Sequence, residues 1–225
     1  MKITLTENLK QKPDFKNLGF GKYFTDHMLY MEYVDGKWGE VEIRPFSDIA
    51  VNPASVVFHY GQEIFEGMKA YKNTDGKITM FRPRDNILRM NRSAKRLCMA
   101  ELPVDEVLEG IFELVRIERD WIPTDPGTSL YIRPTMIANE NFLGVHPSKK
   151  YIFFVILSPV GSYYAHGLEP TRIYVEDVFN RAALGGTGEC KCGGNYACGG
   201  SCETERVRAG FVDGREREKI RRRSR

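Results

Sequence analysis

Residues 188 to 200 read GECKCGGNYACGG and surround one lysine, Lys191, with five glycines and three cysteines. Two kinds of chemistry fit this segment. A neutral lysine amine can attack a carbonyl to form a Schiff base, and glycines let the backbone lie close to a flat ring because they have no Cβ. In this interpretation Gly193 and Gly194 make room for a bulky cofactor beside Lys191. The cysteines offer the alternative, a metal site in which the lysine has no part.

The cysteines form one cluster and one isolated residue. The cluster consists of Cys190, Cys192, Cys198 and Cys202, and Cys98 stands alone in a stretch predicted to be helical. The odd count and the lack of an apolar leader at the N-terminus argue against a disulfide framework. The spacing CxC then CxxxC differs from the paired CxxC of structural zinc sites. We therefore expect no metal and keep a metal-binding module as an alternative.

The basic character of the chain is a property of its tail. Residues 203 to 225 hold nine Lys and Arg against five Asp and Glu, so the tail carries +4 of a net charge of +3 and the rest carries −1. No aromatic residues alternate with these charges, so nucleic-acid binding is not expected. The chain also has no run near the roughly 20 apolar residues that span a membrane. These features predict a cytoplasmic protein without a membrane or nucleic-acid partner.

The first half of the chain predicts an antiparallel sheet with two helices. Residues 30 to 45 alternate around Asp35-Gly36, and AYKNTDGKITMF does so around Asp75-Gly76, both typical of hairpins. A helix follows in RPRDNILRMNRSAKRLCMAEL, and its predicted apolar face is Ile87, Leu88, Met90, Leu97 and Met99. The predicted apolar face of the next helix is Val104, Leu108, Ile111, Phe112 and Val115. Asp105 and Glu106 stand where its N-terminal dipole favours negative charge.

The later segments predict buried strands and a second domain. TSLYIRPTMIA (128 to 138) and YIFFVILSPV (151 to 160) are rich in β-branched and aromatic residues. The predicted organisation is an N-terminal domain over 1–158, a linker over 159–170 and the start of a second domain over 171–225, with an unusual tail from about 198. TRIYVEDV is the predicted first strand of that second domain. The fold class is α/β (α+β), and the length and 42% hydrophobic content are enough for a core.

Several motifs occur in an order that resembles one family. They are FGKYFTDHMLYMEY, FHYGQEIFEGMKAY, FRPRDNILRMNRSAKRLCM, LYIRPTMIANENFLGV and RAALGGTGECKCGGNYA. Over about residues 18 to 197 the chain resembles the branched-chain amino acid aminotransferases, pyridoxal-phosphate enzymes of fold type IV. The resemblance implies pyridoxal 5'-phosphate as the cofactor. It favours the cofactor over the metal as the explanation of the lysine segment.

The resemblance implies a role for each of four cofactor-binding residues. Lys191 matches the lysine that holds the cofactor covalently and moves a proton between the substrate Cα and the cofactor. Tyr196 matches the tyrosine that hydrogen-bonds the phenolic oxygen of the ring. Arg89 matches the arginine that binds the phosphate, where a guanidinium makes bidentate contacts. Arg181 aligns with a further arginine near the cofactor.

The resemblance also implies a substrate pocket. Tyr60 matches a residue that orients the substrate carboxylate, and Phe65 matches one that forms a wall of the side-chain pocket. Tyr131 and Arg133 match the pair that lets the same pocket accept glutamate, whose distal carboxylate needs a cation. Tyr163 matches a tyrosine of the linker that borders the site.

The expected activity is transamination of leucine, isoleucine and valine with 2-oxoglutarate, giving branched-chain 2-oxo acids and L-glutamate in a homodimer. Within the same fold the alternatives are a D-amino acid aminotransferase and an aminodeoxychorismate lyase. FTDHM, FEGMKAY and RMNRS favour the first interpretation. A non-catalytic fragment is the alternative from another class.

The motifs stop after Ala197, and the family's EEVG-like pattern, whose acidic residue pairs with the cofactor's pyridine nitrogen, is missing from the tail. We therefore expect poor activity from the chain as written. One hypothesis is a shifted reading frame, because codons for Glu-Glu-Val-Gly read one base early can encode the final Arg-Arg-Ser-Arg. Resequencing the coding region would test it.

Overall fold

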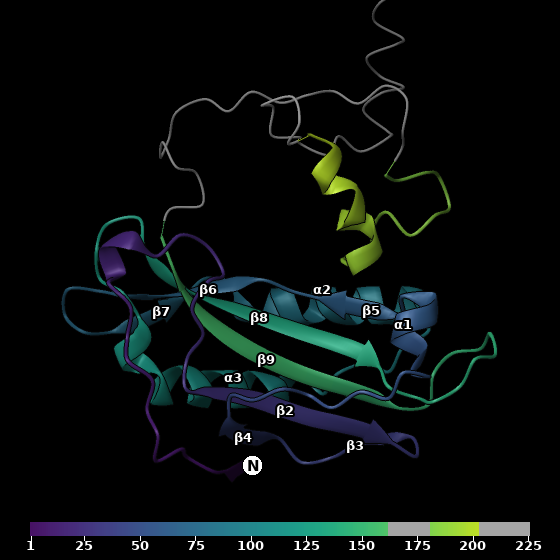
Figure 1. Ribbon diagram of the computed structural model, residues 1–225, viewed down its shortest axis with the longest axis horizontal. Helices are drawn as coiled ribbons and strands as arrows, with labels where there is room; N and C mark the ends of the chain where they lie inside the picture. Colours follow the sequence, from purple (N-terminus) through teal and green to yellow (C-terminus); the bar gives the residue numbers. More distant parts are fainter. Residues whose placement is uncertain (162–180, 203–225) are drawn as a thin grey trace, which may run out of the picture.

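The computed structural model of the chain describes residues 1 to 161 and 181 to 202. A nine-stranded sheet forms the centre of these ranges, in the order β1-β4-β2-β9-β8-β6-β7, with β3 paired to β2 and β5 to β8 (Figure 1). The strands are β1 (Lys2–Ile3), β2 (His27–Val34), β3 (Lys37–Trp38), β4 (Glu42–Pro45), β5 (Glu63–Phe65), β6 (Met68–Lys72), β7 (Ile78–Met80), β8 (Ser129–Ala138) and β9 (Tyr151–Val160). The α-helices are α1 (Val56–Tyr60), α2 (Pro83–Arg96) and α3 (Val104–Ile117), and the 3-10 helices are η1 (Phe15–Asn17), η2 (Arg119–Trp121) and η3 (Gly193–Cys202).

Both predicted hairpins are confirmed. Asp35 and Gly36 join β2 to β3 with φ angles of 53° and 83°, the left-handed backbone that a two-residue type I′ turn requires. In the second hairpin Gly76 has a φ of 81°, and the Asn73 backbone N–H donates to the Lys77 carbonyl at 2.9 Å. This second loop is therefore longer than the first. Apart from the short parallel pair of β1 with β4, the paired strands are antiparallel, as expected.

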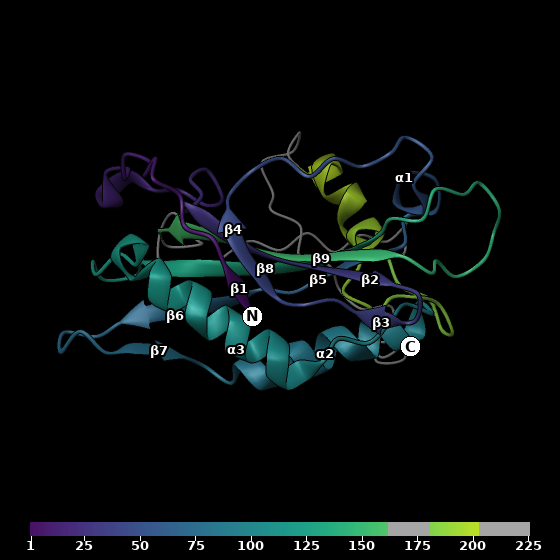
Figure 2. The same ribbon diagram turned by 90° about the horizontal axis from the view of Figure 1, so that it is seen from below.

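The long β8 and β9 strands give the sheet two different faces. Alternate side chains of a strand point to opposite sides, so Ile132 and Met136 of β8 are fully buried while Tyr131 and Arg133 on the other face are only partly buried. The helices α2 and α3 cover the first face, and η3 lies on the opposite side of the sheet (Figure 2). Fully buried members of the core under the helices include Leu29, Ile43, Ile87, Met90, Ile111, Leu114 and Leu157.

The helices confirm the predicted elements but correct two predicted core residues. In α2, Ile87 and Met90 are fully buried, whereas Leu88 is 39% exposed because it lies one helical step away from that stripe. In α3, Phe112 is 49% exposed because it lies one turn from Glu109, on the polar side of the helix. Cys98, predicted inside a helical stretch, follows α2 with a φ of 55°.

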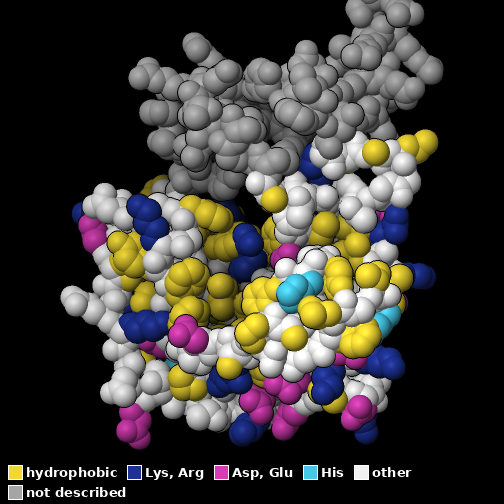
Figure 3. Space-filling model, turned by 45° about the vertical axis from the view of Figure 1, so that its right-hand side comes forward, with side chains coloured by type: hydrophobic (Ala, Val, Ile, Leu, Met, Phe, Trp, Pro, Cys, Tyr) yellow, Lys and Arg dark blue, Asp and Glu magenta, His cyan; other side chains and the backbone are white. Residues whose placement is uncertain are grey.

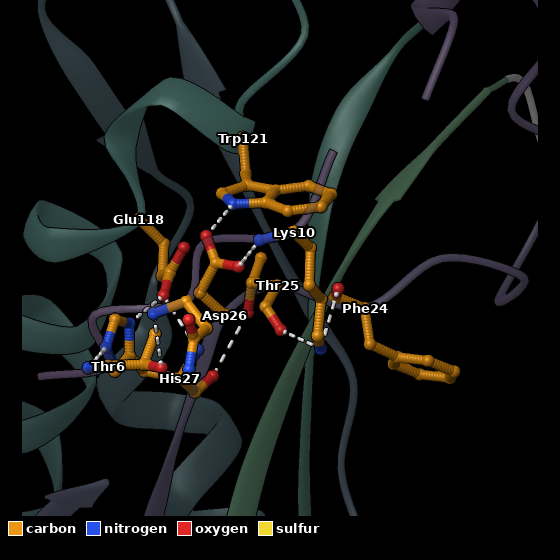
Figure 4. A network of polar contacts seen from close by, with 9 residues as sticks. Thr6, Lys10, Phe24, Thr25, Asp26, His27, Glu118 and Trp121 are labelled. Atoms are coloured by element: carbon orange, nitrogen blue, oxygen red, sulfur yellow. Dashed lines mark hydrogen bonds and ion pairs between the residues drawn. The ribbon is translucent and has the colours of Figure 1, made fainter. Parts of the chain in front are cut away.

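The FTDHM segment fastens the N-terminus to the rest of the domain (Figure 4). His27 Nε2 accepts a hydrogen bond from the Thr6 backbone N–H at 2.9 Å, so the ring proton is on Nδ1, 2.6 Å from a Glu118 carboxylate oxygen. Burial raises the pKa of Glu118 above its ordinary value. The neighbouring Asp26 accepts a 2.8 Å hydrogen bond from the Trp121 indole. These buried contacts give the motif a structural role away from the lysine segment.

Some predictions concern residues outside the described ranges. β9 ends at Val160, so most of the predicted linker at 159–170 and the whole predicted strand TRIYVEDV fall within 162–180, which the structure does not describe. The tail over 203–225 lies outside as well. Among the described residues, no helix has the length and apolarity needed to cross a membrane.

Candidate active site

Three hydrogen bonds hold the Lys191 segment against β5 and α2. The Lys191 carbonyl accepts from the Phe65 backbone N–H at 2.9 Å, and the Lys191 backbone N–H donates to Ser93 Oγ of α2 at 3.1 Å. The Gly193 backbone N–H donates to the Glu63 carboxylate at 2.8 Å. Residues far apart in the sequence therefore fix the backbone on both sides of the lysine.

The glycines of this segment differ in their surroundings. A Cβ at Gly193 would lie 2.2 Å from a Glu63 carboxylate oxygen, so a side chain there would push the segment away from β5. At Gly194 no described atom lies within 4 Å of the position of a Cβ. Gly193 thus has a packing reason to be glycine, in addition to the predicted approach of a cofactor ring. Asn195 stabilises the loop, donating to the carbonyls of Cys190 (2.8 Å) and Thr187 (3.0 Å).

The Lys191 amine lies between two aromatic rings. Its Nζ is 3.1 Å from the Tyr196 hydroxyl and 4.5 Å from the centre of the Phe65 ring. The two rings are 5.1 Å apart between centroids and tilted by 59°. The amine is therefore beside a hydroxyl and an apolar wall, and the structure brings together three residues that the sequence places in one site.

Arg133 lies on the other side of the Phe65 ring. Its guanidinium carbon is 4.5 Å from the ring centre, and its Nε and Nη2 donate to the Tyr131 hydroxyl at 3.2 and 3.0 Å. A Cβ at Gly67 would lie 2.2 Å from that hydroxyl, so the glycine leaves room for Tyr131. Phe65 consequently separates two cationic side chains, one on the lysine segment and one on β8.

Arg89 is held by a buried carboxylate. Its Nε and Nη2 donate to the two Glu66 oxygens at 2.6 and 2.7 Å. The Glu66 side chain is fully buried, whereas that of Arg89 is 49% exposed. The hydrogen bond with Glu66 raises the pKa of Arg89 above its ordinary value, and Tyr196 adds a smaller Coulombic effect in the same direction. Arg89 is thus a permanent cation in the neighbourhood of Tyr196.

The other predicted site residues lie in different surroundings. Tyr60 is 45% exposed, and its hydroxyl donates to the Leu143 carbonyl in the β8–β9 loop. Arg181 donates to the Gly188 carbonyl at 3.3 Å. Tyr163 lies outside the described residues.

Sequence analysis missed Glu63, Glu66 and Ser93. Glu63 and Phe65 are two positions apart in β5 and therefore share a face. Ser93 follows Arg89 by four residues in α2, the spacing of side chains on one side of a helix. Glu66 follows Phe65 directly in the FEG motif. Strand and helix periodicity could have pointed to the first two.

The described residues also bear on the metal alternative and on the hollows of the surface. Within 1–161 and 181–202, no group of three or more His, Cys, Asp or Glu side chains could hold a metal ion. Burial raises the pKa of the Cys190 thiol, which favours the protonated form. A cavity of about 490 Å³ lies near Tyr33, Cys98 and Tyr151, and Lys191 does not line it. Figure 3 shows hydrophobic side chains around a hollow on one face of the molecule.

The described part of the chain has the fold of the fold type IV aminotransferases. It is similar to the branched-chain amino acid aminotransferase from Escherichia coli, with a TM-score of 0.61 and 24% identity over 84% of this chain and 59% of that one. A branched-chain amino acid aminotransferase from T.th., solved with pyridoxamine 5'-phosphate, matches with a TM-score of 0.60 and 25% identity, over 82% of this chain and 60% of the other.

In sequence, the chain is similar to curated branched-chain-amino-acid aminotransferases. It is 52% identical over 190 residues to branched-chain-amino-acid transaminase 1 of Bacillus subtilis (strain 168), covering 84% of this chain and 53% of that protein. It is 46% identical over 226 residues to branched-chain-amino-acid aminotransferase 2 of the same strain, covering 98% of this chain and 62% of the relative. The chain thus spans about half to three fifths of these relatives. No protein-family model matches it.

Proposed function

We propose that this chain contributes the lysine, the phosphate-binding arginine and the substrate pocket of a pyridoxal-phosphate-dependent branched-chain amino acid aminotransferase. The activity is transamination of leucine, isoleucine or valine with 2-oxoglutarate, which yields the 2-oxo acid and L-glutamate. The observation that carries the proposal is the position of the Lys191 amine, 3.1 Å from the Tyr196 hydroxyl and over the Phe65 ring. The similarity to proteins named for this activity supports it.

The residues present fit pyridoxal 5'-phosphate in three respects. The aldehyde needs an amine, and Lys191 holds one beside an apolar ring. The phenolic oxygen needs a hydrogen-bond donor, and the Tyr196 hydroxyl lies next to that amine. The phosphate needs a cation, and the half-exposed Arg89 keeps donors beyond the two that bind Glu66. Amine, hydroxyl and guanidinium are thus supplied by two segments that the fold brings together.

Each of these residues has a defined task in the proposal. The Lys191 amine condenses with the aldehyde, one water molecule leaves, and the freed amine later carries the proton removed from the substrate Cα. Tyr196 donates a hydrogen bond to the phenolic oxygen, and Arg89 binds the phosphate. When bound, the coenzyme stabilises the negative charge that develops on Cα.

The substrate side of the proposal rests on Phe65, Tyr131 and Arg133. The Phe65 ring offers an apolar wall to branched aliphatic side chains, while the Arg133 guanidinium, 4.5 Å from the same ring, offers a cation to the distal carboxylate of glutamate. One pocket can therefore take both kinds of substrate. We extend the proposal to a homodimer, which the resemblance implies and which sedimentation velocity would test.

The proposal is tested by adding pyridoxal 5'-phosphate to the full chain and recording the visible absorbance of the lysine-bound coenzyme. After reduction with borohydride, peptide mass mapping should locate the added mass on Lys191. Lys191→Ala should lose both features, whereas the matched control Lys95→Ala, an exposed lysine of α2, should keep them. A coenzyme mass spread over surface lysines, or none at all, would reject the proposal. Formation of glutamate from L-leucine and 2-oxoglutarate, but not from D-leucine, tests the substrate class.

A further inference from the structure

We propose that Glu66 is a positioning residue, which fixes the orientation of Arg89 so that its outer edge faces the phosphate of the coenzyme. This inference rests on the function proposed above and deepens it. Glu66 is fully buried on the short connection between β5 and β6. Its two oxygens bind Arg89 through Nε and Nη2 at 2.6 and 2.7 Å. A buried carboxylate with a bidentate partner sets both the position and the plane of the guanidinium.

Other contacts hold the carboxylate itself in place. The Asn86 side-chain amide and the Gly67 backbone N–H each donate to the same Glu66 oxygen at 3.1 Å. The Glu66 backbone N–H donates to the Pro134 carbonyl of β8 at 2.8 Å. Glu66 is thus tied to the sheet, and through its side chain it ties α2, which carries both Asn86 and Arg89, to the sheet.

The pairing leaves part of the guanidinium for another acceptor. A guanidinium has five N–H donors, and the contacts with Glu66 occupy Nε and one hydrogen of Nη2. The Nη1 edge points away from the carboxylate, and the side chain of Arg89 is 49% exposed. An anion can therefore approach the outer edge while Glu66 holds the inner one. Phosphate oxygens suit such an edge because they accept parallel hydrogen bonds.

A second effect of Glu66 has the opposite sign. A carboxylate beside Arg89 also reduces the net positive charge that a phosphate meets. If this charge effect were the larger, neutralising Glu66 would strengthen phosphate binding. If orientation is the larger, as proposed, neutralising Glu66 weakens it. The direction of the change therefore separates the two possibilities.

The experiment compares pyridoxal 5'-phosphate with pyridoxal, which lacks the phosphate, on the full chain. The ratio of their dissociation constants reports the contact with the phosphate and little else. In Glu66→Gln we expect this preference for the phosphorylated coenzyme to fall about ten- to hundredfold, the range seen when residues that orient a ligand-binding side chain are replaced. Arg89→Ala should remove the preference, and adding Glu66→Gln to Arg89→Ala should cause no further loss.

The chain offers a matched control in Glu113, which makes a bidentate pair with Arg116 on the exposed side of α3. Glu113→Gln should leave the preference unchanged. An unchanged or increased preference in Glu66→Gln overturns the inference, and so does an equal loss for both compounds, which indicates general damage. If neither compound attaches to Lys191 in the unmodified chain, the proposed function itself fails.

Replacement of a fully buried carboxylate can prevent folding, so a milder variant completes the test. Asn86→Ala removes one support of Glu66 and keeps both charges of the pair. We expect a smaller fall in the preference, with binding of pyridoxal retained. If Asn86→Ala keeps the full preference while Glu66→Gln fails to fold, as judged by circular dichroism, the positioning role is rejected.

Discussion

The two faces of β8 are stabilised in different ways. Under the helices, Ile132 and Met136 are fully buried among apolar side chains of the same domain. On the opposite face, Tyr131 and Arg133 pair with one another and with the Phe65 ring, and Phe65 in turn accepts the segment of Lys191. The first face derives its stability from burial, and the second depends on a few polar contacts between distant segments. Substitutions on the two faces should therefore affect different properties.

The largest effect on stability is expected on the helix-covered face. Ile132→Ala removes a fully buried side chain, and the lost burial with the cavity left behind should lower the free energy of unfolding by about 2 to 5 kcal/mol. Thr135→Ala, on the other face of the same strand, should lower it by less than about 1 kcal/mol. Urea denaturation followed by circular dichroism measures both values. Equal losses would show that the two faces do not differ in this way.

The same contrast explains what could be predicted from sequence. The hairpins and the helices follow from turn residues and apolar spacing, which are local. Leu88 and Phe112 were misplaced because periodicity alone leaves the width of a buried stripe open. The contacts of the candidate site join residues far apart along the chain, with separations of 98 for Lys191 with Ser93 and 130 for Gly193 with Glu63.

Such pairs cannot be derived from local patterns, because they depend on how β5, α2 and the lysine segment pack. The membership of Lys191, Tyr196 and Arg89 in one site came from the family resemblance. Glu66, which no motif rule singles out, emerged only from the contacts of the fold. The site face is accordingly the part of the molecule where sequence analysis is weakest and where variants are most informative.

The second largest effect is expected on function. In Arg133→Met the pocket keeps an apolar side chain but loses the cation, so kcat/KM for 2-oxoglutarate should fall about ten- to hundredfold, corresponding to about 1.5 to 3 kcal/mol for a charged hydrogen bond. The reaction of the bound coenzyme with leucine alone, followed by absorbance, should change much less. Arg116→Met on α3 is the control. Equal losses for both substrates would remove Arg133 from carboxylate recognition.

A smaller effect is expected where the lysine segment meets β5. Gly193→Ala brings a Cβ within 2.2 Å of the Glu63 carboxylate, so docking of the segment should weaken by about 1 to 3 kcal/mol. Hydrogen exchange at the backbone amides of Lys191 and Gly193 measures this weakening. Gly194→Ala should be nearly neutral, since no described atom lies within 4 Å of its Cβ position. Glu63→Ala should relieve the Gly193→Ala clash, and absence of such relief would contradict the contact.

The smallest effect concerns the pH dependence of stability at Glu63. Burial raises the pKa of this carboxyl above its ordinary value of 4.5, against weaker opposing effects of the Gly193 N–H and Arg133. A group whose pKa is higher in the folded state takes up a proton on folding, so its contribution to stability falls as pH rises from 4.5 through the folded pKa. The difference in unfolding free energy between the unmodified chain and Glu63→Gln should therefore decrease with rising pH in that window. Glu113→Gln provides a control of opposite sign, because the hydrogen bond with Arg116 lowers the pKa of Glu113. Urea denaturation at a series of pH values would show the two differences changing in opposite directions, and parallel changes would contradict the burial of Glu63 beneath the lysine segment.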